Sequence, residues 1–167
     1  MIDIKILPES NIAVHPAGLR DFKAVQHLEK VCFEQDAWPM LDILGVLTIP
    51  QVIRLKAVDQ ENLIGFIAAD LRRTQGVAWI ATLAVLPEYR RLGVAEGLLK
   101  ICEDQITLPR IRLTVRQSNY PAIELYRKAG YQQIEIWKKY YRGGEDALIF
   151  EKHPRASKLG AEHFPPG

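Results

Sequence analysis

The sequence predicts an α/β fold in one domain, with a central mixed sheet of about six to seven strands flanked by about four helices. Two patterns predict this class. Apolar residues alternate over 52–58 and again over 63–71 around the polar turn 59–62, which is typical of an antiparallel hairpin. The nearly continuous apolar run 77–86 then precedes a helical stripe and another strand, as in a strand–helix–strand unit.

Before the hairpin, the sequence indicates one short strand and two helices. The strand covers 11–14. The first helix follows Asp21, a suitable N-cap, and has apolar residues at helical spacing as far as Cys32. The dipeptide Trp38-Pro39 interrupts it, and a second short helix is predicted over 40–47.

After the hairpin, Pro87 ends the long apolar strand and a helix follows. Its apolar residues form one stripe, consisting of Leu92, Ala95, Leu98, Leu99, Cys102 and Ile106. Alternation over 111–115 predicts a strand, and a helix over 120–129 ends at Gly130, a residue suited to a left-handed stop. Two last strands, 132–141 and 146–151, flank the turn 142–144.

Length and composition restrict the class of protein. A chain of 167 residues with 48% hydrophobic residues is one domain's worth of sequence, which we place at 1–152, with a C-terminal tail at 153–167. The 22 basic and 20 acidic residues leave a net charge of +2, which excludes the strongly basic field of a general nucleic-acid binder. No apolar stretch approaches the roughly 20 residues of a membrane helix, so we expect neither nucleic acid nor membrane as a partner.

The two cysteines, Cys32 and Cys102, both lie in apolar stretches where a free thiol behaves as a small hydrophobic group. The apolar run before Pro8 is too short and too polar for a signal peptide. We therefore expect a cytoplasmic protein. The four histidines show no ligand spacing, and no metal site is predicted.

The segment 83–95 is the most informative for chemistry. A buried strand breaks at a proline, and Arg90, Arg91, Gly93 and Ala95 open an amphipathic helix. The first N–H groups of a helix have no internal partners, and small residues let a phosphate approach them closely. This pattern favours a pyrophosphate site. The alternative interpretation is that Gly93 has no function in binding. It would then be a glycine that the first turn of the helix tolerates, and the two arginines would only face solvent.

The motif Arg90-x-x-Gly93-x-Ala95 after a strand resembles the acetyl-coenzyme A motif of the Gcn5-related N-acetyltransferase family. The second half adds to the resemblance, because the segments 115–119, 122–131, 139–141 and 145–147 are similar to bacterial enzymes that acetylate the N-terminal alanine of a ribosomal protein. The resemblance implies an enzyme that uses acetyl-coenzyme A (acetyl-CoA), with 1–152 as an acetyltransferase domain and a mostly antiparallel sheet. It leaves a homodimer possible.

The resemblance also implies roles for individual residues. The cofactor-binding residues would be Leu83, Ala84, Val85, Arg90, Arg91, Leu92, Gly93, Val94, Ala95 and Asn119. Tyr126 would be the general acid that returns a proton to the leaving thiolate, whose pKa is about 8.5 in solution. A core aromatic on the apolar face of its helix is the alternative role for Tyr126.

One position departs from the family pattern. The N-terminal alanine acetyltransferases have a glutamate as general base where this chain has Thr114. Thr82 and Thr114 are candidates to hold a water relay instead. Without an obvious base, an acceptor of low pKa is favoured: an α-amine is roughly a tenth neutral at pH 7, whereas a lysine amine is neutral in about one molecule in 2,500.

The family lines its acceptor groove with the segment that corresponds to 32–40. Glu34 or Asp36 would contact an ammonium group, and Trp38 would form a wall of the groove. Tyr140 and Tyr141 would bind the acceptor's backbone. The alternative for Glu34 and Asp36 is that they are solvated acids on a loop. The alternative for Trp38, Tyr140 and Tyr141 is that they only pack against neighbouring residues. A protein N-terminus is the favoured acceptor, and a small-molecule amine such as an amino acid, a polyamine or an aminoglycoside is the alternative acceptor. The alternative function is a domain that binds acyl-CoA without turnover.

Overall fold

One eight-stranded sheet organises the described part of the chain, which is residues 4–5 and 11–154 of a computed structural model. The strands are β1 (Ile4–Lys5), β2 (Ile12–Pro16), β3 (Val52–Asp59), β4 (Asn62–Arg72), β5 (Val77–Val85), β6 (Arg110–Arg116), β7 (Gln132–Trp137) and β8 (Ala147–Lys152). Their order in the sheet is β1-β2-β3-β4-β5-β6-β8-β7, and only the pair of β5 and β6 is parallel. The predicted class, an α/β fold with a mixed and mostly antiparallel sheet, is confirmed.

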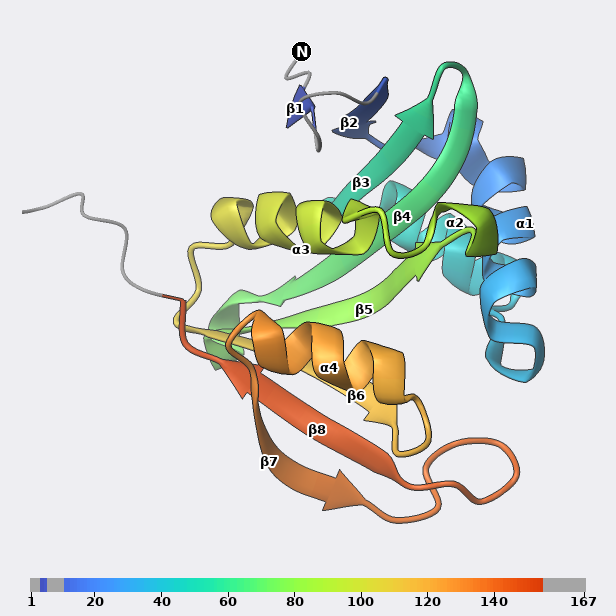
Figure 1. The fold of residues 1–167 in the computed structure, drawn as a ribbon. Helices are drawn as coiled ribbons and strands as arrows, with labels where there is room; N and C mark the ends of the chain where they lie inside the picture. Colours follow the sequence, from blue (N-terminus) through green and yellow to red (C-terminus); the bar gives the residue numbers. More distant parts are fainter. Residues whose placement is uncertain (1–3, 6–10, 155–167) are drawn as a thin grey trace, which may run out of the picture.

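Four α-helices cover the two faces of this sheet (Figure 1). They are α1 (Phe22–Phe33), α2 (Met40–Thr48), α3 (Val94–Gln105) and α4 (Tyr120–Lys128). In Figure 1, α3 and α4 lie in front of the sheet, whereas α1 and α2 lie behind it. The sequence predicts all four helices because each has a continuous apolar face.

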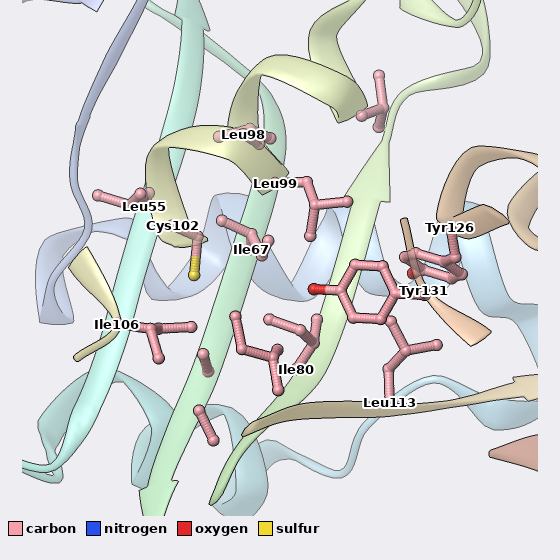
Figure 2. Packing of buried hydrophobic residues seen from close by; sticks show 14 of the residues in the cluster. Leu55, Ile67, Ile80, Leu98, Leu99, Cys102, Ile106, Leu113, Tyr126 and Tyr131 are labelled. Atoms are coloured by element: carbon pink, nitrogen blue, oxygen red, sulfur yellow. The ribbon is translucent and has the colours of Figure 1, made fainter. Parts of the chain in front are cut away.

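Each face has its own core. On the α3 face, Leu98, Leu99 and Cys102 point from the helix toward Ile67 and Ile80 of the sheet (Figure 2), and all five are buried. The other core packs α1 and α2 against the opposite side of β4 and β5. Its buried residues are Ala17, Val25, Leu28, Ile43, Leu47, Phe66, Ala68 and Ala84. A fully buried leucine or isoleucine contributes about 1.5–3 kcal/mol, so both cores hold the helices firmly against the sheet.

The strands β5 and β6 separate halfway along their length. They pair only over 77–80 and 110–113, although β5 continues to Val85 and β6 to Arg116 (Figure 1). A bulge marks the point of separation, since Ile80 pairs with Ala69 and Thr82 with Ala68, which leaves Ala81 as an extra residue. Bulges increase local twist. Beyond Ile80, the β6-facing edge of β5 therefore has no strand partner among the residues that the structure describes.

Two predicted boundaries are wrong. The stripe of α3 does not include Leu92, which lies in the loop before the helix and is 48% exposed, because the helix begins only at Val94. The strand predicted over 132–141 ends at Trp137. There the Asp146 carboxylate accepts a hydrogen bond from the Lys139 N–H (2.9 Å), and Lys139 has a φ of 51°, which strand geometry does not allow.

None of the helices within the described ranges is long and apolar enough to cross a membrane. The tail predicted at 153–167 falls almost wholly outside the described residues, which end at 154. The boundary at 152 coincides with the end of β8 and stays a prediction.

Candidate active site

A cavity of about 640 Å³ lies where β5 and β6 separate. This volume is in the range of small-ligand sites. It is lined from α1 and the following loop, from the strands β4, β5, β6 and β7, from α4 and from the loop after β7. Predicted site residues in its lining are Trp38, Thr82, Leu83, Thr114, Asn119, Tyr126, Tyr140 and Tyr141. The separation of two strands thus brings together residues from most of the chain.

Other predicted site residues lie outside this lining. Glu34 is exposed on the short 3-10 turn after α1, and its side chain does not line the cavity. Ala84 packs into the core beneath α1 and α2. The Val85 carbonyl accepts hydrogen bonds from Cys32 Sγ (3.3 Å) and from Arg90 Nε (3.2 Å), so the Arg90 side chain folds back onto the strand end.

The start of α3 has the backbone that the motif predicts. Gly93 is its N-cap with a φ of 79°, and Arg91 before it also has a positive φ of 61°. The Gly97 N–H donates to the Gly93 carbonyl (2.9 Å) as the first bond of the helix. The N–H groups before Gly97 in this turn are therefore available to an anion, with the positive end of the helix dipole behind them.

Tyr126 belongs to α4, and Asn119 is the N-cap residue before this helix. The Asn119 side-chain oxygen accepts a hydrogen bond from the Ala122 N–H (3.3 Å), so Asn119 caps the helix while it lines the cavity. Tyr126 is 7% exposed and packs edge-on against Tyr131 with ring centroids 5.8 Å apart. Burial raises the pKa of Tyr126, and the charge of an ionised Tyr141 would raise it further. Tyr126 therefore holds its proton at neutral pH.

Glu29 is a lining residue that the sequence analysis missed. It lies on the buried face of α1 and is 1% exposed, and the Thr82 hydroxyl donates a hydrogen bond of 2.7 Å to its Oε1. Burial raises the pKa of this carboxyl to about 7, against the opposing effects of Thr82 and the Trp38 backbone N–H. Its position one helical turn after Val25, within the apolar stripe, was the available signal.

Arg116 of β6 joins two walls of the cavity. Its guanidinium pairs with Asp36 of the loop after α1 (2.6 Å) and with Glu145 before β8 (2.7 Å), and it lies 4.5 Å from the ring centre of Tyr141. Tyr141 in turn donates a long hydrogen bond of 3.4 Å to Thr114. Because Asp36 is already paired with Arg116, it helps to form the wall of the cavity and is not an unpaired carboxylate that is free to bind an ammonium group.

A row of aromatic rings also lines the cavity; the sequence analysis named Tyr140 but missed Trp79 and Trp137. Trp79 of β5 lies 5.9 Å from Trp137 of β7, and Trp137 lies 5.4 Å from Tyr140, measured between ring centroids. Arg72 stacks over Trp79 at 5.5 Å. Within the described ranges, no three His, Cys, Asp or Glu side chains cluster as metal ligands do.

Comparison with known proteins agrees with the fold. The chain resembles an N-alpha-acetyltransferase of Saccharolobus solfataricus, with 42% identity over 77 residues, 44% of this chain and 46% of the relative. It thus spans about half the length of that relative. An uncharacterised N-acetyltransferase of Methanocaldococcus jannaschii is 33% identical over 143 residues, which are 82% of this chain and 89% of the relative.

Solved structures show the same fold. The ribosomal-protein-S18-alanine N-acetyltransferase of Escherichia coli has a TM-score of 0.79 at 23% identity, over 92% of this chain and 99% of that one. Arabidopsis thaliana NAA60 in complex with acetyl-CoA has a TM-score of 0.76 at 21% identity, over 86% and 98%. The model of the acetyltransferase (GNAT) family matches residues 22–131. The protein therefore belongs to the GNAT family of acetyltransferases, as the motif at Arg90–Ala95 predicted.

Proposed function

We propose that the protein transfers an acetyl group from acetyl-CoA to a primary amine, with the N-terminal α-amine of a polypeptide as the favoured acceptor. The observation behind this proposal is the cavity between the separated ends of β5 and β6, which has the buried, protonated Tyr126 in its lining. The N-alpha-acetyltransferase among the relatives supports an α-amine over other acceptors.

The donor would lie along the open edge of β5 and at the start of α3. An extended chain such as pantetheine can pair with unpartnered strand edges, here at 83–85. The helix-start N–H groups over 91–95, together with Arg90 and Arg91, suit its pyrophosphate. When bound, the donor supplies an activated acetyl thioester.

The chain's own groups would then support a direct attack by the amine in a ternary complex. Tyr126 is protonated at neutral pH and is a general acid for the departing sulfur. Backbone N–H groups at the β5 edge are candidates to stabilise the oxyanion of a tetrahedral intermediate. Thr114 cannot take a proton as a glutamate would, so the acceptor must be an amine that loses its proton readily.

A polypeptide end suits this cavity better than a compact amine. The aromatic row of Trp79, Trp137 and Tyr140 offers flat apolar surface in the cavity lining, which backbone and side chains of a peptide can cover. Arginine and acid groups near it are already paired with each other, as in Arg72–Asp70 and Arg116–Asp36. A polycation such as an aminoglycoside would find few unpaired carboxylates there.

We also propose a cytoplasmic location and a single acetyltransferase domain over 1–152. We propose neither nucleic acid nor a membrane as a partner, and the proposal is compatible with a homodimer. Cys32 and Cys102 are both free thiols, which suits a reducing compartment. The net charge of +2 suits an acceptor other than nucleic acid.

The test is release of free thiol from acetyl-CoA with a panel of acceptors. The panel contains short peptides with free Ala, Ser or Met N-termini, an N-blocked lysine peptide, spermidine and an aminoglycoside. We expect turnover on at least one α-amino peptide and little on the others. Turnover confined to a small amine would replace the proposed acceptor class. Tight binding of coenzyme A without turnover on any member would overturn the proposal in favour of a binding domain.

A further inference from the structure

The buried carboxyl of Glu29 takes no part in the proposed donor binding or in the proposed acid step at Tyr126. It is one of two buried polar or charged residues in the described part of the chain, and the other is its partner Thr82. Both line the cavity. Glu29 Oε1 accepts the Thr82 hydroxyl at 2.7 Å, whereas Oε2 has no hydrogen-bond partner among the residues that the structure describes. A buried acid with one unsatisfied oxygen is costly and calls for an explanation.

The bulge at Ala81 explains how the pair meets. Simple alternation would put Ile80, Thr82 and Ala84 on one side of β5. Instead Ile80 belongs to the core under α3, whereas Ala84 belongs to the core under α1 and α2. The extra residue turns Thr82 toward α1, where Glu29 lies. One side of the Thr82 hydroxyl is thus fixed on a carboxylate, and its lone pairs remain to accept a proton from the cavity side.

Resting on the proposed function, we propose that Glu29 and Thr82 are the proton-accepting pair for the incoming ammonium group, in place of the glutamate that the family resemblance expects at position 114. The ammonium nitrogen gives one proton to Thr82 Oγ1, and the hydroxyl proton of Thr82 passes to Glu29 Oε1. An ammonium and a carboxylate become a neutral amine and a carboxylic acid, so charge and atoms balance. The proton leaves Glu29 by the reverse route after product release.

The surroundings of Glu29 favour this transfer. Burial places the pKa of Glu29 at about 7, close to the roughly 7.7–8.0 of an α-amine, so little free energy separates the two proton positions. On α1 itself, Cys32 is the titratable neighbour, and the charge of Glu29 helps to raise its pKa. Across the cavity, Tyr126 is protonated, and the carboxylates of Asp36 and Asp70 are each paired with an arginine.

The experiment compares the pH dependence of kcat in matched variants, with the α-amino peptide that the wild type acetylates. Glu29→Gln keeps the size of the side chain and an oxygen for Thr82 but cannot take a proton. Thr82→Val removes the hydroxyl at constant shape, and Thr82→Ser restores it. Binding of coenzyme A and a cooperative thermal unfolding transition are measured for each variant, because a folded protein with an intact donor site must retain both.

We expect Glu29→Gln and Thr82→Val each to lower kcat about tenfold at pH 7, where only about a tenth of the α-amine is neutral without a base, and by less than about twofold at pH 9, where the amine is already neutral. The double variant should lose no more than either single one. Thr82→Ser should recover most of kcat. A loss that is equal at every pH, or an unchanged kcat in both single variants, would overturn the proposal. Absence of wild-type turnover would instead overturn the proposed function.

Discussion

The Arg116 guanidinium on β6 donates a hydrogen bond of 2.6 Å to the Asp36 carboxylate in the loop after α1. This ion pair connects segments that are 80 positions apart in the sequence and closes one side of the cavity. Both side chains are about one quarter exposed, at 23% and 24%, so solvent screens the pair only in part. From this position we predict that the pair affects acceptor binding rather than the reaction step.

We predict that Asp36→Asn raises the KM for the acceptor about fivefold, which corresponds to about 1 kcal/mol, and leaves the KM for acetyl-CoA unchanged. The loop after α1 then loses its tie to β6. The matched control is Glu151→Gln, which removes the pair between Glu151 of β8 and Arg112 of β6, the strand that also bears Arg116, outside the cavity lining. Equal effects of the two substitutions on acceptor KM would contradict this role of Asp36.

Tyr126→Phe should lower kcat by about 10²–10⁴-fold because the general acid is lost, while the affinity for coenzyme A changes little. Steady-state kinetics together with direct binding of coenzyme A separate the two quantities. Tyr131→Phe is the matched control, because Tyr131 is also buried and its hydroxyl donates to Glu103 (2.8 Å) away from the cavity. If both variants keep wild-type kcat, Tyr126 is a packing residue only.

Gly93→Ala should raise the KM for acetyl-CoA about five- to tenfold and leave the acceptor KM unchanged. A side chain at a φ of 79° strains the turn by about 1 kcal/mol and displaces the N–H groups that suit a pyrophosphate. Gly76→Ala introduces similar strain at a φ of 63°, in the turn before β5. A parallel rise in KM for both variants would point to general destabilisation instead.

Glu29→Gln should change how stability depends on pH. The pKa of Glu29 rises from 4.5 to about 7 on folding, so the folded state keeps a proton that the unfolded chain has lost. The contribution of this carboxyl to stability is therefore highest below pH 4.5 and falls by about 3 kcal/mol as the pH rises through 7.

Urea unfolding from pH 4.5 to pH 8 measures this effect. The free energy of unfolding of the wild type should fall relative to that of Glu29→Gln across the interval, and other titrating groups cancel in the difference. A constant difference between the two proteins would show that the pKa of Glu29 is not raised.

Local patterns made most of the fold and part of the site predictable from sequence. The motif at Arg90–Ala95 and the helix that bears Tyr126 depend on neighbouring residues, so periodicity, glycine and proline identify them. The error at Leu92 has a local cause as well. Helical spacing alone would extend the apolar stripe of α3 back to Leu92. In the structure these residues form a loop instead, because Arg91 and Gly93 have positive φ and the helix begins only at Val94.

Glu29 escaped prediction because its environment is tertiary. Its place within the apolar stripe of α1 was a weak signal, because an acid on a helix is most often solvated, and the contact with Thr82 that holds this carboxyl is formed only in the folded structure. That contact depends in turn on the bulge at Ala81, which reverses the expected direction of Thr82 and has no clear signature in an apolar strand. The aromatic row likewise needs Trp79 and Trp137 from strands that are 58 positions apart.

The most direct test of the account is the position of the acetyl group on a peptide that has both a free N-terminus and an internal lysine. After incubation with acetyl-CoA, fragmentation mass spectrometry assigns the modified nitrogen. We expect acetylation of the α-amine and an unmodified lysine. Acetyl on the lysine ε-amine, with the α-amine left free, would contradict it.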